Sequence, residues 1–210
     1  MLNPRKILVI RFSSLGDLVL TTPIFRELKR FYPDAEITLL TSSGLHSVLD
    51  NNPQIDHVIM HSRKETRMQL KFLIQNLRKE KYDLIYDAHR SLRSIWIVWN
   101  LSGFGILKKP KVWSINKRSW QRSLLIRLKL NLLKKTDPQR LHLLRPLQTH
   151  TNLELHNQTE LFPDKSAILR TQEFLKKYNL QPKQFVAIGP SASYPLKCWP
   201  LEYFQVLISN

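Results

Sequence analysis

Over the first 110 residues, short apolar runs rich in β-branched residues alternate with segments in which apolar residues recur at helical spacing. The short runs predict strands over 6–12, 35–41, 55–61 and 82–88. The other segments predict helices over 24–32, 45–51, 66–81 and 91–101. Strands that alternate with helices pair in parallel through right-handed crossovers. The pattern therefore predicts an α/β fold with a doubly wound, Rossmann-like parallel sheet.

The rest of the chain begins with a less regular pattern and then starts a new unit. A mixed apolar and basic stretch predicts a helix over 117–135, whereas the polar, proline-containing residues 138–163 predict a connection. A helix, a strand and a helix are then predicted over 167–178, 185–189 and 200–208. Because one strand and one helix cannot bury their apolar faces alone, we expect a domain over 1–165 and an incomplete second domain over 166–210.

Positive charge is concentrated in the middle of the chain. The formal net charge is +17, and residues 61–145 hold 21 Lys and Arg against 5 Asp and Glu. Such a field attracts anionic partners, such as a phosphorylated glycolipid, an anionic membrane surface or nucleic acid. Any single basic run could instead be a solvated helix face. Nothing in the chain matches a known nucleic-acid-binding motif, so we do not expect nucleic acid to be the partner.

The cysteine count and the lengths of the apolar runs indicate in which compartment the protein is found. The single cysteine, Cys198, excludes an intramolecular disulfide framework and fits a reducing compartment. No apolar run reaches 18 residues, and the apolar run near the N-terminus is too short for a signal peptide. These features predict a cytoplasmic protein.

The loop after the first predicted strand carries candidate chemistry. Ser13, Ser14, Gly16 and Asp17 follow the strand at the sheet edge where α/β folds bind ligands. The serine hydroxyls could donate to a phosphate or sugar, and the glycine permits a positive φ or a close ligand approach. Asp17 could act as a general base toward a hydroxyl, or it could simply cap the following helix. The loop has neither a dinucleotide-binding nor a P-loop pattern.

Three segments of the chain carry family-like motifs, and they are, in this order, ILVIRFSSLGDLVLTTPIFRELKRFYPDAEITLL, YDLIYDAHRSLRS and FVAIGPSASYPLKCWPLEYF. Together they resemble the bacterial heptosyltransferases that use ADP-heptose to build the lipopolysaccharide inner core. The second segment departs from the family where His89 and Arg90 replace a Gln-Gly-like pair, and the third lacks a usual glycine. Complete members continue into a further nucleotide-binding motif, so the resemblance implies that the chain is truncated in its C-terminal domain.

The resemblance implies a fold and a reaction. The family has two facing Rossmann-like domains, the GT-B arrangement, and transfers heptose with inversion from ADP-heptose to a phosphorylated, lipid-linked oligosaccharide. By analogy, Asp17 deprotonates the acceptor hydroxyl, and Lys197 stabilises the departing ADP. Backbone N–H groups of Ser191 and Ala192 would bind the same diphosphate. His142 corresponds to a family histidine near the domain junction.

The resemblance also implies how the acceptor is held. Arg63, Lys64 and Arg67 lie where the family collects cations for acceptor phosphates and carboxylates, although each could be a solvated helix edge. The chain contains no Asp-x-Asp, so we expect no metal at the nucleotide and no cofactor beyond the donor substrate. The expected location is the cytoplasmic face of the anionic inner membrane. The alternative function is a truncated, non-catalytic module that binds anionic glycolipid or membrane.

Overall fold

The computed structural model describes residues 3–62, 64, 66–103, 109–117, 119–130, 138–151, 154–181, 183–192, 194 and 197–209, with the side chains of 119–123 excepted. The chain divides into two compact units, Met1–Pro163 and Asp164–Asn210.

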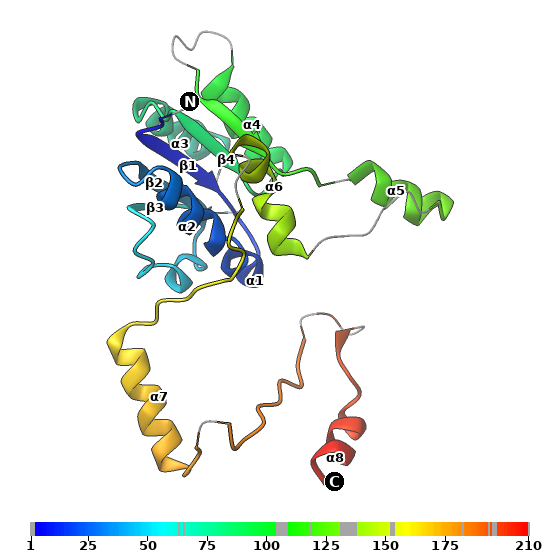
Figure 1. The fold of residues 1–210 in the computed structure, drawn as a ribbon. Helices are drawn as coiled ribbons and strands as arrows, with labels where there is room; N and C mark the ends of the chain where they lie inside the picture. The colour runs from blue at the N-terminus through cyan, green and yellow to red at the C-terminus, as the bar shows by residue number, and fades with distance from the viewer. Residues whose placement is uncertain are drawn as a thin grey trace. The chain divides into compact units, whose positions relative to one another are not determined.

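The first unit is built on a five-stranded parallel sheet (Figure 1). Its strands are β1 (Lys6–Ile10), β2 (Glu36–Ser42), β3 (His57–His61), β4 (Leu84–Asp87) and β5 (Lys111–Ser114). They lie in the order β3-β2-β1-β4-β5, and every neighbouring pair is parallel. The parallel α/β fold predicted from the sequence is therefore confirmed. Strand β5 was not predicted, because its four residues begin with a lysine and follow a basic stretch.

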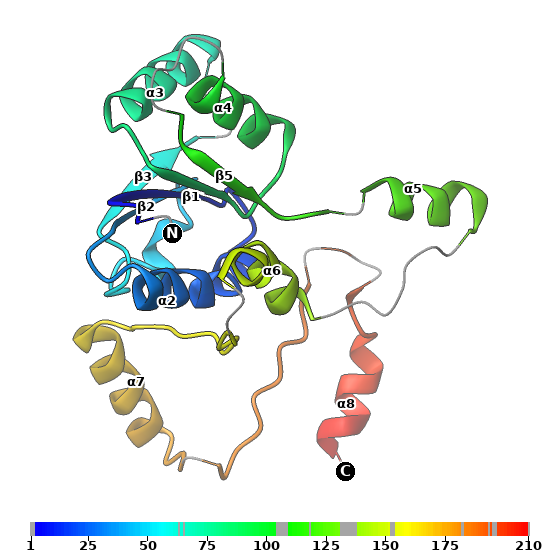
Figure 2. The same ribbon diagram turned by 45° about the horizontal axis from the view of Figure 1, so that its top comes forward.

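Helices cover both faces of this sheet (Figure 2). One face packs against α1 (Leu15–Val19), α2 (Thr22–Phe31) and α6 (Gln139–Thr151), and the other against α3 (Arg67–Lys79) and α4 (Leu92–Ser102). The short 3-10 helix His46–Val48 and α5 (Ser119–Leu128) complete the unit. The doubly wound arrangement thus has a helical layer on each side.

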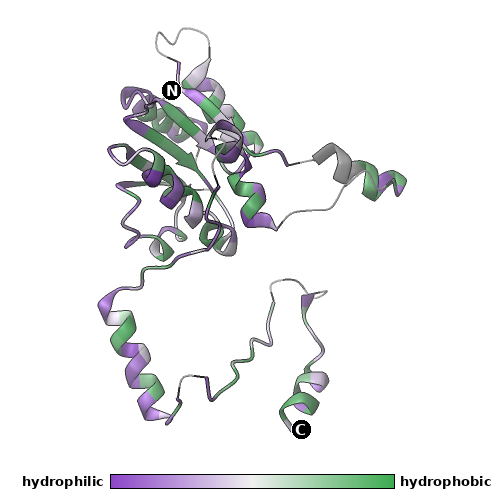
Figure 3. Ribbon diagram, in the orientation of Figure 1, coloured by the Kyte–Doolittle hydropathy of each residue, from purple (hydrophilic) through white to green (hydrophobic). Residues whose placement is uncertain are grey.

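The middle strands are apolar because both of their faces are buried. Alternate β1 side chains point to opposite faces, so Ile7 and Val9 join the α2 side while Leu8 and Ile10 join the α3 side. All four are fully buried, and the hydrophobic colour dominates this strand in Figure 3. Burial on both faces explains why the sequence shows a continuous apolar run here rather than an alternating pattern.

The expected connection over 138–163 is wrong for its first half, which forms α6. This helix contains Pro146, yet it places Leu143, Leu144 and Leu147 in the core. The buried Tyr86 hydroxyl donates a 2.6 Å hydrogen bond to the Leu143 carbonyl, which fixes the helix over the sheet. The sequence missed α6 because polar residues interrupt a short leucine stripe and a proline normally disfavours a helix interior.

The segment after α6 is held on α2. Arg26 pairs with Glu160 and donates to the His156 carbonyl at 2.8 Å, and Arg30 donates to the Glu154 carbonyl at 2.8 Å. These bonds explain how a polar, irregular segment is held against α2 within the first unit.

The second unit consists of α7 (Lys165–Lys177), α8 (Leu201–Ser209) and the chain between them. The strand predicted over 185–189 does not form in this part of the structure. Its side chains are exposed, Val186 most of all at 86%. A strand needs a neighbour for its N–H and C=O groups, and no described residue of this unit forms one. No helix within the described residues is long and apolar enough to cross a membrane.

Replacement of Leu143 by alanine should destabilise the first unit by about 2–5 kcal/mol, because it empties a fully buried site under α6. Urea denaturation of the purified protein measures the change in unfolding free energy. Leu128→Ala is the matched control, since that side chain is 60% exposed on α5. Equal stability of the two variants would show that α6 is not packed on the sheet.

Candidate active site

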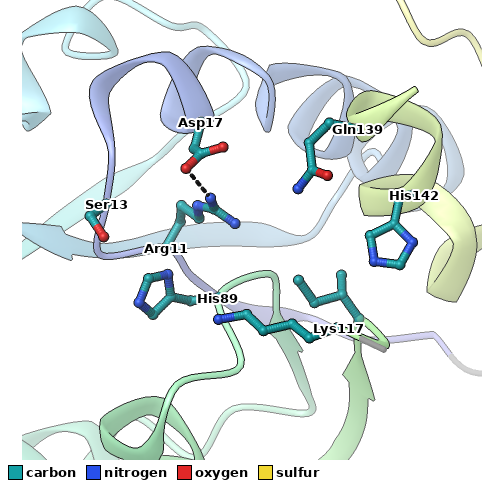
Figure 4. Close-up of a pocket in the computed structure, with 8 residues that line it drawn as sticks. Arg11, Ser13, Asp17, His89, Lys117, Gln139 and His142 are labelled. Carbon is teal, nitrogen blue, oxygen red and sulfur yellow. Dashed lines mark ion pairs between the residues drawn. The ribbon is translucent and has the colours of Figure 1, made fainter. Parts of the chain in front are cut away.

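A cavity of about 420 Å³ opens at the carboxyl end of the central strands (Figure 4). Its lining comes from segments far apart in the sequence, brought together because parallel strands end at the same sheet edge. The lining residues are Arg11, Ser13, Asp17, His89, Ile115, Lys117, Gln139 and His142. The cavity suits an anionic ligand that also presents a hydroxyl, because it is lined by an arginine, a lysine, two histidines and one carboxylate.

Asp17 lies in the first turn of α1 and is held by two partners. Its Oδ2 is 2.7 Å from Nη2 of Arg11 and accepts hydrogen bonds of 3.2 Å from the backbone N–H and the hydroxyl of Ser14. The side chain keeps 34% of its surface exposed. The carboxylate is thus fixed in direction but open to the cavity.

These partners lower the pKa of the Asp17 carboxyl group. Burial alone would raise the pKa of its carboxyl group, but the Ser14 hydrogen bonds and the positive charge of Arg11 outweigh burial and lower the pKa below its ordinary value of 3.8. Asp17 is therefore ionised at neutral pH and can accept a proton.

Arg11 is the first residue after β1 and joins two strand ends to α1. Its side chain is 6% exposed, and Nη1 donates a 2.6 Å hydrogen bond to the Ala88 carbonyl after β4. A buried guanidinium needs a counter-charge, and Asp17 supplies it. Arg11 thereby fixes the position of Asp17 relative to the β4 end of the cavity.

The turn after β4 presents His89. The buried carboxylate of Asp87 accepts hydrogen bonds from the N–H groups of His89 and Arg90 at 3.0 and 2.7 Å, and from the Ser94 hydroxyl at 2.9 Å. These bonds hold Arg90 in a left-handed conformation with φ of 46°. His89 packs edge-on against Phe12, with 5.4 Å between ring centroids. The His-Arg pair that departs from the family pattern is thus part of an ordered turn.

The loop residues predicted from the sequence lie at or beside the cavity. Ser13 and Asp17 line it, whereas Ser14 acts on Asp17. Gly16 lies within α1 without a positive φ, and a side chain there would meet nothing within 4 Å, so the conformational freedom expected of this glycine is not used. Asp17 both accepts the Ser14 N–H, as a capping residue does, and faces the cavity.

Two of the three predicted acceptor cations are not part of this cavity. Lys64 and Arg67 are exposed near the start of α3, and neither is among the lining residues. Arg63 lies outside the described residues.

The predicted donor residues belong to the second unit. Ser191 and Ala192 are exposed in chain without regular structure. Lys197 is exposed in a short turn, where its N–H donates to the Tyr194 carbonyl at 2.9 Å. Among the described residues, no group of three or more His, Cys, Asp or Glu side chains could hold a metal ion.

Sequence analysis overlooked Arg11, Lys117 and Gln139. Arg11 left a usable signal, because a charged residue that directly follows an apolar central strand lies at the ligand-binding edge. The other two follow β5 and begin α6, the two elements that the sequence did not predict. Their place in the cavity therefore could not be found without the fold.

Replacement of Arg11 by methionine should raise the pKa of Asp17, because the substitution removes the nearby positive charge and a hydrogen bond. An NMR titration of aspartate side-chain carboxyl carbons measures this. Lys29→Met is the matched control: Lys29 pairs with Asp56 at 2.8 Å, and loss of that pair should raise the pKa of Asp56 alone. An unchanged Asp17 pKa in Arg11→Met would show that Ser14 alone sets it.

Comparisons with solved structures support the fold. The chain is similar to a glycosyl transferase family 9 protein from Veillonella parvula, with a TM-score of 0.74 and 22% identity, over 98% of this chain and 59% of that one. It is also similar to E. coli heptosyltransferase WaaC with ADP-2-deoxy-2-fluoro heptose, with a TM-score of 0.62 and 18% identity, over 97% and 64% of the two chains. The Rossmann-like, GT-B-type fold class predicted from the sequence is confirmed.

Comparisons of sequence support the family. A putative glycosyltransferase of Haemophilus influenzae is 38% identical over 94 residues, or 45% of this chain and 27% of that protein. Lipopolysaccharide heptosyltransferase 3 of E. coli is 36% identical over 88 residues, or 40% and 25%. The matches to these two relatives thus cover about a quarter of each relative's length. The profile of glycosyltransferase family 9 (heptosyltransferase) matches residues 71–210, two thirds of the chain. The chain belongs to glycosyltransferase family 9, the heptosyltransferases.

Proposed function

We propose that this chain carries the acceptor side of an inverting glycosyltransferase that moves heptose from ADP-heptose to the lipopolysaccharide inner core. Family membership and the names of the similar proteins, a lipopolysaccharide heptosyltransferase and a heptosyltransferase with an ADP-heptose analogue, support this reaction class. The proposed acceptor is a phosphorylated, lipid-linked oligosaccharide at the cytoplasmic face of the inner membrane. Donor and acceptor are both anionic, in keeping with the net charge of +17.

The observation that carries the proposal is the ionised Asp17 inside a cavity that also holds Arg11 and Lys117. A lowered pKa makes the carboxylate a weak base toward a free hydroxyl. It can still take the proton as the hydroxyl oxygen loses electron density to a new bond. The cations would bind acceptor phosphates or carboxylates and orient the hydroxyl toward the carboxylate.

The proposed step is a single displacement. The acceptor oxygen forms a bond to the anomeric carbon of heptose while the bond from that carbon to the β-phosphate oxygen of ADP breaks. The hydroxyl proton passes to Asp17, and the electron pair of the broken bond leaves with ADP. Attack from the face opposite the leaving group inverts the anomeric configuration.

ADP departs with an added negative charge, which a base alone does not stabilise. We assign that role to the ammonium of Lys197, with the N–H groups of Ser191 and Ala192 as further donors to the diphosphate. This assignment rests on the family resemblance of the segment around Lys197. It requires no metal ion at the nucleotide.

Asp17→Asn should lower kcat for heptose transfer by about 10²–10⁴-fold, because it removes the proton acceptor while keeping the shape of the side chain. The assay follows ADP release with an acceptor prepared from a heptose-deficient strain. Asp34→Asn is the control, since Asp34 is exposed between α2 and β2 at the opposite sheet edge. Circular dichroism shows whether each variant is folded, and a folded Asp17→Asn enzyme with wild-type kcat would refute the assignment.

Lys197→Ala should weaken ADP binding roughly tenfold or more, since hydrogen bonds to charged groups contribute about 1.5–3 kcal/mol. Isothermal titration calorimetry with ADP measures the dissociation constant. Lys177→Ala, an exposed lysine in the last turn of α7, controls for loss of general positive charge. If neither variant changed the affinity, Lys197 would have no role at the diphosphate. If the wild type bound no ADP, the non-catalytic module would replace the enzyme as the better function.

A further inference from the structure

The solvent-facing side of α4 is apolar. Ile97 and Leu101 point into the core, as expected for a helix packed on a sheet. The opposite side of the helix, normally polar in a surface helix, carries four exposed apolar side chains at i, i+3, i+4 and i+7. These are Leu92, Ile95, Trp96 and Trp99. The two tryptophan rings stack with 5.4 Å between centroids and an interplanar angle of 27°.

Helix α3 repeats this feature beside α4. Its core side holds Ile74 and Leu77, while Met68 and Phe72, one turn apart, are exposed. The two helices lie on the same face of the sheet (Figure 2), joined by Arg78, which donates to the Asn100 carbonyl at 2.8 and 3.0 Å.

We call the exposed apolar side chains of these two helices the α3–α4 apolar surface, namely Met68, Phe72, Leu92, Ile95, Trp96 and Trp99. Single exposed apolar residues are ordinary, whereas four along one side of α4, with two more on the neighbouring helix, are typical of an interaction surface. Met68 and Phe72 also line a hollow with Met60 of β3.

The charge on the same two helices is of one sign. They carry five cations and no carboxylate between their ends, and the cations are Arg67, Lys71, Arg78, Lys79 and Arg93. Of these, Arg67, Lys71, Arg78 and Lys79 are exposed. Exposed tryptophan, long apolar side chains and lysine or arginine together are typical of surfaces that bind the headgroup region of anionic bilayers. Tryptophan in particular favours that boundary, because its ring is apolar and its N–H is polar.

We propose that the α3–α4 apolar surface docks on an anionic lipid bilayer. Trp96, Trp99 and Phe72 enter the headgroup and upper acyl region, and the cations of the two helices pair with lipid phosphates. Leu92, at the start of α4, lies three residues after His89 of the cavity, so a short stretch of chain joins the surface to the candidate active site. We expect docking to bring the cavity near the bilayer that a lipid-linked acceptor leaves, and in this respect the inference rests on the proposed function.

Vesicle co-sedimentation of the purified protein tests the surface without any transfer reaction. The vesicles are phosphatidylcholine alone or phosphatidylcholine mixed with phosphatidylglycerol. Wild-type protein should bind the anionic vesicles and lose affinity with added salt. Trp96→Ser with Trp99→Ser should bind roughly tenfold or more weakly, since two large, half-exposed rings no longer enter the bilayer. Lys71→Gln with Lys79→Gln should bind anionic vesicles roughly tenfold or more weakly.

The chain offers a matched control for the aromatic pair. Phe174 of α7 and Tyr178, the residue that follows this helix, also lie ring against ring, tilted by 50° with 4.8 Å between centroids, and are each 55% exposed, against 51% and 59% for the tryptophans. Phe174→Ser with Tyr178→Ser should keep wild-type vesicle affinity. Equal loss in both double variants, or none in the tryptophan variant, would overturn the proposal. A dimer that the tryptophan variant dissociates, with no vesicle binding by wild type, would instead assign the surface to a second copy.

A heptose-transfer assay with a water-soluble acceptor fragment tests the docking surface and the proposed function separately. The tryptophan double variant should keep wild-type kcat on that fragment, because its side chains lie outside the cavity, and should lose rate only on acceptor embedded in vesicles. Absence of transfer by the wild type would refute the proposed function and leave the vesicle result standing. Normal transfer with unchanged vesicle binding in the variant would refute the docking surface alone.

Discussion

The ion pair between the buried guanidinium of Arg11 and the half-buried carboxylate of Asp17 organises the candidate site. The Arg11 guanidinium is almost fully buried, and it bonds to a carbonyl after β4 as well as to the carboxylate on α1. A cation in that position needs a counter-charge, so the same contact that holds α1 against the sheet also keeps Asp17 ionised and fixed at the cavity. The Asp87 carboxylate orders the neighbouring turn in the same way, through its bonds to His89, Arg90 and Ser94. The contacts of Arg11 therefore both position α1 at the sheet edge and hold the Asp17 carboxylate ready to accept a proton.

Part of the positive charge of the chain gathers at two places in the fold, one for each of the two proposals. Arg11 and Lys117 lie at the cavity, whereas α3 and α4 carry their cations on the outside of the sheet, around the exposed apolar stripe. Basic residues that the sequence shows as one excess of charge thus lie in two parts of the fold. One group is at the candidate active site, and the other is on the surface proposed to bind anionic lipid. The proposed enzyme needs both, because its acceptor is anionic and attached to a membrane.

Prediction from sequence succeeded for elements whose buried side chains form a clear hydrophobic pattern along the chain. The strands around β1 were predicted because each is a continuous apolar run, and α3 and α4 because one stripe of each faces the core. Prediction failed at β5, which is short and begins with a lysine, and at α6, where Pro146 and polar residues obscure Leu143, Leu144 and Leu147. It failed also at 185–189, where the residues favour a strand but the described unit supplies no neighbour. Nothing in the sequence indicated that the tryptophans of α4 face outward, since hydropathy alone does not separate two apolar sides of one helix.

The sequence by itself determined the α/β fold, the family and the loop that carries Asp17, because local periodicity and contiguous motifs encode these features. Only the tertiary structure decided which residues share the cavity. Arg11, His89, Lys117, Gln139 and His142 come from four separate parts of the chain, and they meet because parallel strands all end at one sheet edge. The tertiary structure also decided that Lys64 and Arg67 lie outside that cavity. Their place depends on the side of the sheet to which α3 crosses over, and no local pattern specifies that side.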